Sequence, residues 1–201
     1  MGTNATLNID YTDVPSDYVP FEIFLSGLKG GHSGLEIHLG KGNAIKLMSR
    51  LINTFSFDFY LAYIQGGNKR NAIPREAEAK IFVKKNDIDL FKLKIKEVEN
   101  EFVDEFKTAE PDVKISTKEI ELNDKKAFNK NFTVKLLKVL LACPHGVVNL
   151  SQDIAGLVET STNLAIIETL DSKISLVTTQ RSSIESAKQY IAASTKSVFE
   201  L

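Results

Sequence analysis

Hydrophobic and polar residues follow two periods along this chain, and the first is the pattern of strands with one buried face. The segment "EAEAKIFVKK" (76–85) alternates charged and apolar residues, as a half-buried strand does. Other segments are rich in aromatic and β-branched residues and lie beside glycine or proline. We predict strands in residues 20–28, 55–65, 76–85 and 112–120, and a hairpin of 156–170 with 173–183 across Asp171-Ser172.

The second period is helical, with apolar residues three or four positions apart. Asn43 is a suitable N-cap for a first helix, Asp87 opens a second, and Pro111 marks the end of the second. Residues 132–143 and 184–199 form two more predicted helices. The expected buried faces are Ala44, Leu47, Met48, Leu51, Ile52 and Phe55; Ile88, Phe91, Ile95, Val98, Phe102 and Phe106; Leu136, Leu137, Leu140 and Leu141; and Ile184, Ala187, Ile191 and Val198.

The order of these elements predicts an α+β fold. The first half runs strand, helix, strand, strand, helix, strand, which is the split βαβ or ferredoxin-like unit with an antiparallel sheet and helices on one face. The second half looks like a partial repeat of it. We predict two such lobes, residues 1–121 and 122–201, that share or abut sheets, with the polar segment Leu122–Asn131 as the boundary.

Composition excludes several classes of partner. The 201 residues carry 25 basic and 26 acidic side chains, and this balance gives no reason to expect binding to nucleic acid or an anionic membrane. No apolar run reaches the ~18 residues of a membrane span. Cys143 is the only cysteine, so an internal disulfide is excluded and a reducing cytoplasm is the expected location.

Three kinds of catalytic site are poorly supported by the residues. The three histidines, His32, His38 and His145, begin no His-x-Asp motif, and no two glutamates are adjacent, so no metal ligand set is predicted. The glycines around His32 lack the spacing of a phosphate loop. Ser33 beside His32 is a poor nucleophile pair, and Cys143 is better interpreted as a small buried hydrophobe.

Four polar residues at turns remain as candidates: His32, Asn71, Asn163 and Arg181. Composition alone favours an ordinary interpretation, in which Asn71 is a turn residue before Pro74 and Arg181 is a surface charge at a strand end.

Four segments give a more specific indication. In order, "LKGGHSGLEIHLGKGNAIKLMSRLI", "GGNKRNAIPREAEA", "GLVETSTNLAII" and "SLVTTQRSS" resemble the lid of the bacterial aminoacyl-histidine dipeptidases, which are relatives of carnosinase and the aminoacylase-type zinc peptidases. The resemblance implies a two-metal catalytic domain outside this chain, so that the chain begins after the first catalytic segment and ends before the last. The isolated chain is expected to bind no cofactor and to be inactive.

The resemblance also assigns roles. His32 matches the lid histidine that hydrogen-bonds the oxyanion of the tetrahedral intermediate, and Asn71 matches a polar residue that contacts the substrate. Arg181 is similar to the arginine that binds the substrate carboxylate. Single-lobe relatives carry that arginine at the place that Lys84 occupies here, so we assign the carboxylate contact to Arg181. Asn163 is a further candidate contact.

The function implied is the lid of a cytoplasmic metallodipeptidase that hydrolyses Xaa-His dipeptides, with two divalent ions, zinc for preference, in the absent domain. A homodimer through the lid is also compatible with the resemblance. The alternative is a stand-alone α+β module that dimerises or binds a partner through an exposed sheet edge and has no catalytic role.

Overall fold

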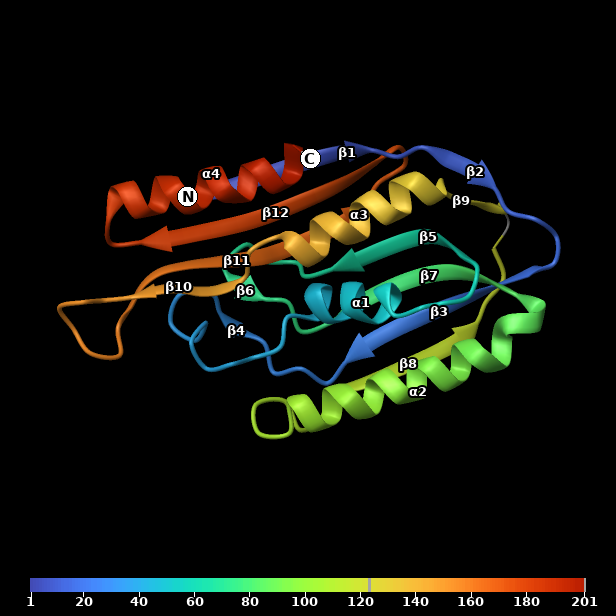
Figure 1. Cartoon of the computed structure of the whole chain (residues 1–201), viewed down its shortest axis with the longest axis horizontal. Helices are drawn as coiled ribbons and strands as arrows, with labels where there is room; N and C mark the ends of the chain where they lie inside the picture. The colour runs from blue at the N-terminus through green and yellow to red at the C-terminus, as the bar shows by residue number, and fades with distance from the viewer. Residues whose placement is uncertain (123, 201) are drawn as a thin grey trace.

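The computed structural model describes residues 1–122 and 124–200, and its backbone is organised around one large sheet (Figure 1). The strand order is β1-β12-β11-β5-β7-β3-β8, and β10 pairs with β11. Its strands pair antiparallel throughout the described residues. The elements are β1 (Gly2–Asn8), β2 (Tyr11–Asp13), β3 (Tyr18–Ser26), β4 (Gly31–His32), α1 (Ala44–Asn53), β5 (Phe59–Gly66), β6 (Ala72–Ile73), β7 (Ala77–Lys84), η1 (Lys85–Asp87), α2 (Ile88–Glu105), β8 (Lys114–Glu119), β9 (Lys126–Phe128), α3 (Lys130–Ala142), β10 (Gly146–Leu150), β11 (Val158–Thr169), β12 (Lys173–Ser182) and α4 (Glu185–Glu200).

The helices pack on one face of this sheet, and their apolar stripes meet in a single core (Figure 1). In α2 the buried residues are Phe91, Ile95, Val98 and Phe102. In α1 the Asn43 side chain accepts hydrogen bonds from the first-turn amides of Ile45 and Lys46, as expected of an N-cap. The predicted α+β class, with an antiparallel sheet and helices on one face, is confirmed.

One detail of the predicted helices is wrong. Ile184 is 46% exposed and precedes α4, whose buried residues are Ile191, Thr195 and Phe199. The chain is still bending at Ile184, so this residue does not face the core. Asp87 occupies the position before the first residue of α2, as predicted, and Ile88 packs against the core.

The two predicted lobes share one continuous sheet. Gly66 at the end of β5 pairs with Ile167 of β11, and the Thr169 hydroxyl bonds both backbone groups of Ile64. At Gly67 the backbone φ is +68°, and a Cβ there would lie only 2.0 Å from the Ala165 carbonyl oxygen, so a glycine is required for this close approach.

The ends of the predicted lobes also interlock. β1 pairs with β12 along seven residues, although the first belongs to the predicted lobe 1–121 and the second to 122–201. Within the predicted boundary, Ala127 and Phe128 are fully buried, β9 pairs with β2, and Asn123 lies outside the described residues. The division into 1–121 and 122–201 stays a prediction.

Candidate functional site

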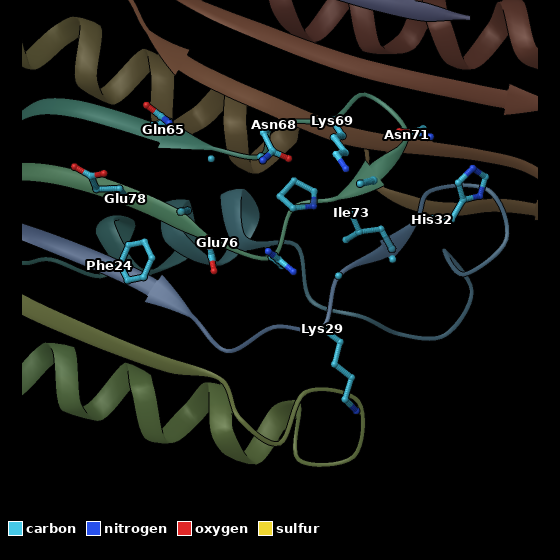
Figure 2. A pocket seen from close by; sticks show the side chains of 18 residues that line it. Phe24, Lys29, His32, Gln65, Asn68, Lys69, Asn71, Ile73, Glu76 and Glu78 are labelled. Atoms are coloured by element: carbon cyan, nitrogen blue, oxygen red, sulfur yellow. The ribbon is translucent and has the colours of Figure 1, made fainter.

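A short two-stranded ribbon brings two of the predicted site residues together. In it β4 pairs with β6, so that His32 lies opposite Ala72. The ribbon continues for one more bond, because the Ser33 amide donates to the Asn71 carbonyl oxygen at 2.9 Å. Figure 2 shows His32 and Asn71 at the same end of the groove. Residues 32 and 71, far apart in sequence, therefore share one small structural unit.

The imidazole of His32 has a defined orientation. Its Nδ1 atom accepts hydrogen bonds from the backbone amides of Gly34, at 3.3 Å, and Leu35, at 3.1 Å. An imidazole nitrogen that accepts from an amide carries no proton, so the neutral ring carries its proton on Nε2. The Nε2–H group is then the donor available to a ligand.

Glu36 and Lys41 hold the backbone around His32 in place through hydrogen bonds and an ion pair. The His32 amide donates to Glu36 Oε2 at 2.7 Å, and Glu36 Oε1 pairs with Lys41 Nζ at 2.5 Å. Lys41 also donates to the Gly30 carbonyl oxygen at 2.6 Å. The hydrogen bond from Lys41 lowers the pKa of Glu36, with a further contribution from the His32 amide. These bonds connect residues before His32 with residues after it, and so hold the turn in one shape.

Arg181 lies against the same turn from the other half of the chain. It is an exposed residue near the end of β12, opposite Ser161 of β11. A Cβ built on Gly34 would lie 3.0 Å from Arg181 Cδ and 3.1 Å from its Nε. The absence of a side chain at Gly34 therefore leaves room for Arg181 beside the loop that carries His32.

Asn163 lies beneath the ribbon, in the interior. Its side chain is fully buried, and Nδ2 donates to the Ala72 carbonyl oxygen at 2.9 Å, while Oδ1 has no hydrogen-bond partner among the described residues. The direct contact shown for Asn163 is thus with β6, and its predicted contact with substrate stays a prediction.

The open space next to the ribbon is a groove of about 520 Å³ on the sheet face opposite the helices (Figure 2). His32 and Asn71 line one end of it, and Phe24 and Gln65 line the other. Charged side chains of both signs line it as well, namely Lys29, Lys69, Arg75, Glu76 and Glu78. A polar, partly open groove of this kind suits a small charged ligand better than an apolar one.

Three other residues with charged or nucleophilic side chains do not complete the candidate site, namely Lys84, Cys143 and Ser33. Lys84 is the last residue of β7, at the end of that strand far from the ribbon, and pairs with Asp17 at 3.9 Å. Cys143 is 1% exposed, and burial raises the pKa of its thiol to about 11. Ser33 is buried, and within residues 1–122 and 124–200 its hydroxyl has no hydrogen-bond partner and hence no activating base.

Two interior residues near the site had no sequence signal of their own. Glu110, just after α2, is fully buried and accepts backbone hydrogen bonds from Lys29 and Gly42. Lys46 on α1 donates to the last carbonyl groups of α3. Neither residue belongs to a recognisable motif, because its partners lie 68 or more positions away.

A metal ligand set is not found in the part of the chain that the structure describes: no three His, Cys, Asp or Glu residues there could hold an ion together. The residues present therefore do not fit a metal centre. Among the described helices, none is long and apolar enough to cross a membrane.

Comparison with known proteins gives consistent matches. Residues 24–113 match the family model described as a peptidase dimerisation domain. The chain is 34% identical over 199 residues to the cytosol non-specific dipeptidase of Escherichia coli (strain K12), covering 98% of this chain and 41% of that protein. The crystal structure of aminoacylhistidine dipeptidase from Vibrio alginolyticus matches with a TM-score of 0.95 and 32% identity, covering 99% of this chain and 41% of that one. The predicted resemblance is confirmed, and the chain spans about two fifths of the length of these relatives.

Proposed function

Because this chain carries a peptidase dimerisation domain over residues 24–113, we propose that it is the lid of a dipeptidase whose catalytic centre lies in another part of a longer protein. The substrates proposed are Xaa-His dipeptides, in line with the name of the relative from Vibrio alginolyticus. The location proposed is the cytoplasm, in line with the name of the Escherichia coli relative.

The observation that carries this proposal is the fixed imidazole of His32. Two backbone amides bond its Nδ1 atom, so the Nε2–H group is the free donor. During hydrolysis of a peptide bond, negative charge develops on the former carbonyl oxygen. A donor already oriented toward that oxygen stabilises the transition state without reorganisation, and losing one such donor typically costs about 3–4 kcal/mol.

Arg181 and Asn71 would contact the polar ends of the substrate. Arg181 lies beside the turn that carries His32, and its planar guanidinium can bind a C-terminal carboxylate through two parallel hydrogen bonds. Asn71 is joined to the same turn through the bond from the Ser33 amide, and its side-chain amide can donate to a carbonyl or carboxylate oxygen. Both residues then orient the dipeptide relative to His32.

The metal ions of the proposed enzyme are bound by the part of the protein outside this chain. The resemblance implies two divalent ions, zinc for preference, and a general base in the catalytic domain. The described residues of this chain offer no ligand set for them, so the lid contributes only contacts to the substrate and the oxyanion.

The proposal is tested by His32→Ala in the longer enzyme, with His38→Ala as the control because His38 is an exposed histidine on the same loop. His32→Ala is expected to lower kcat by roughly 10²–10³ at unchanged metal content. His38→Ala is expected to retain activity. The isolated 201-residue chain should hydrolyse no Xaa-His dipeptide with zinc added. Normal kcat in His32→Ala, or clear activity of the isolated chain, contradicts the proposal.

The match to a dimerisation domain also favours a homodimer, which we propose as a second role. Strand β10 is exposed and carries apolar side chains at Val147, Val148 and Leu150 that a second copy could cover. Sedimentation equilibrium should show a dimer that Leu150→Lys weakens. A chain that stays monomeric at all concentrations contradicts this role.

A further inference from the structure

The segment from Lys29 to Gly42, named here the histidine loop, leaves β3 and returns to α1 with both of its ends bound by one carboxyl group. Glu110 Oε2 accepts from the Lys29 amide at 2.7 Å, and Glu110 Oε1 accepts from the Gly42 amide at 3.0 Å. The side chain of Glu110 is fully buried. From these contacts we propose that Glu110 is a positioning residue that fixes the histidine loop, and thereby His32, for catalysis.

The first argument is the chemistry of the contact. A buried carboxyl group is costly unless its oxygens are hydrogen-bonded, and here each oxygen has its own backbone donor. Bonds of backbone amides to a carboxylate are stronger than bonds between neutral groups. A single side chain therefore closes the base of the loop, and closing the base removes much of the freedom of the residues between the two ends.

The second argument is the close fit of the segment that carries Glu110. Gly27 has a φ of +83°, and a Cβ there would lie 1.8 Å from the Asp112 carbonyl oxygen. Only glycine allows the chain after α2 to come this near the end of β3. Lys29 Nζ also donates to the Ala109 carbonyl oxygen at 2.7 Å. The segment 109–112 is thus built against the start of the histidine loop.

The third argument is the division of roles within the loop. Glu36 and Lys41 bind groups inside it, at His32 and Gly30. Glu110 comes from outside and connects the loop to the helix α2 and its core. Internal bonds preserve the shape of the loop. Its position relative to the sheet and Arg181 is set by external bonds, namely those of Glu110 at the two ends of the loop and the pairing of β4 with β6 at His32.

This inference rests on the proposed role of His32, but its first test does not depend on activity. In the ¹⁵N-labelled chain, the ring nitrogens of His32 report the tautomer, and amide exchange reports the bonds of Lys29 and Gly42. Glu110→Gln is nearly isosteric, but its NH₂ group faces one of the two backbone donors. We expect exchange of the Lys29 and Gly42 amides to accelerate by about tenfold or more. The ring signals of His32 should shift toward a mixture of tautomers.

Glu99→Gln is the matched control. Glu99 Oε1 also accepts a backbone bond, from Ile115 at 2.9 Å, but it lies on α2 away from the histidine loop. The Glu99→Gln variant should leave the Lys29, Gly42 and His32 signals unchanged. Glu110→Asp provides a second variant should Glu110→Gln fold poorly, because its shorter side chain retains the carboxyl group but cannot reach both amides. If both Glu110 variants leave the His32 signals as they are in the parent chain, the proposal is overturned.

The second test separates this proposal from the proposed function. In the longer enzyme, Glu110→Gln should lower kcat with little change in KM, and adding it to His32→Ala should lower kcat no further. An additional loss of at least tenfold in the double variant would show that Glu110 acts independently of His32. If His32→Ala itself has normal kcat, the proposed function fails, while the exchange and tautomer measurements still decide whether Glu110 fixes the loop.

Discussion

Asn163 and Ala72 are joined by a hydrogen bond of 2.9 Å from the side-chain Nδ2 atom to the backbone carbonyl oxygen. Asn163 belongs to β11 in the second half of the chain, and Ala72 belongs to β6 opposite His32. The bond therefore supports the ribbon of the candidate site from below. It also explains why a polar residue is fully buried at this point of the sheet.

The first prediction concerns this bond. Asn163→Ala leaves the Ala72 carbonyl oxygen without its buried donor and is expected to lower the free energy of unfolding by about 1–3 kcal/mol. The amide of Ser33, which bonds Asn71 in the same ribbon, should exchange faster. Thr160→Ala removes a buried side chain of the same strand whose hydroxyl bonds Ser182 instead, and it should leave the Ser33 amide protected. Equal Ser33 exchange in both variants contradicts the support role.

The second prediction concerns Arg181 in the longer enzyme. A carboxylate contact is made in the ground state and the transition state alike, so Arg181→Ala should raise KM more than it lowers kcat. A substrate with an amidated C-terminus should be affected little. Lys84→Ala is the control, because Lys84 lies at the far end of β7 and pairs with Asp17. A KM effect in Lys84→Ala as large as that in Arg181→Ala would place the carboxylate contact elsewhere.

The third prediction concerns the junction of α1 with α3. Lys46 Nζ donates to the carbonyl oxygens of Leu140 and Leu141 at 2.7 Å and to that of Cys143 at 2.9 Å, where a helix end leaves such groups unpaired. Lys46→Met retains much of the apolar stem and removes the donor. We expect a loss of about 2–3 kcal/mol in urea unfolding. Lys138→Met, at an exposed position of α3, should change stability by less than about 0.5 kcal/mol.

The fourth prediction concerns pH. Burial, with a smaller contribution from the charge of Lys46, lowers the pKa of His145 from 6.5 to about 4. The unfolded chain therefore binds this proton at a higher pH than the folded chain does. The stability due to neutral His145 is fully present above pH 6.5 and is lost as the pH falls toward 4.

We expect this residue to account for about 1–3 kcal/mol of the stability lost over that range. Urea unfolding at about pH 7.5 and about pH 4.5 should show a smaller pH effect in His145→Gln than in the parent chain. An unchanged pH effect would mean that His145 titrates alike in both states.

The fifth prediction concerns the core. Phe102 on α2 is 1% exposed and also lies under the Arg50 guanidinium, whose Cζ is 4.9 Å from the ring centroid. Phe102→Ala should cost about 3–5 kcal/mol in the free energy of unfolding. Leu93→Ala changes a residue of the same helix that is 57% exposed, and its effect should be small. Similar effects in the two variants would contradict the assigned face of α2.

The sequence by itself determined the four α-helices, the strands β3, β5, β7, β8, β11 and β12, and most of their buried faces, but it did not reveal β1, β2, β9 or β10. The stripe of Phe91, Ile95, Val98 and Phe102, the cap at Asn43 and the hairpin of β11 with β12 all follow from spacing, because each depends on neighbours a few residues away. The candidate site was reached from the sequence as well, but through motifs that resemble a family. Those motifs indicated His32, Asn71, Asn163 and Arg181 without showing how they meet.

The tertiary structure alone decided how the halves join and what positions the site. The pairing of β1 with β12 and of β5 with β11 unites the predicted lobes in one sheet, and pairing between distant strands leaves no periodic signal in either. Glu110 has no such signal either, because only the fold brings the two backbone amides that it binds to its side chain. Hydrogen bonds to backbone groups do not depend on the identity of the partner residue, and when that partner is distant in the chain, as for Glu110, the sequence cannot reveal them.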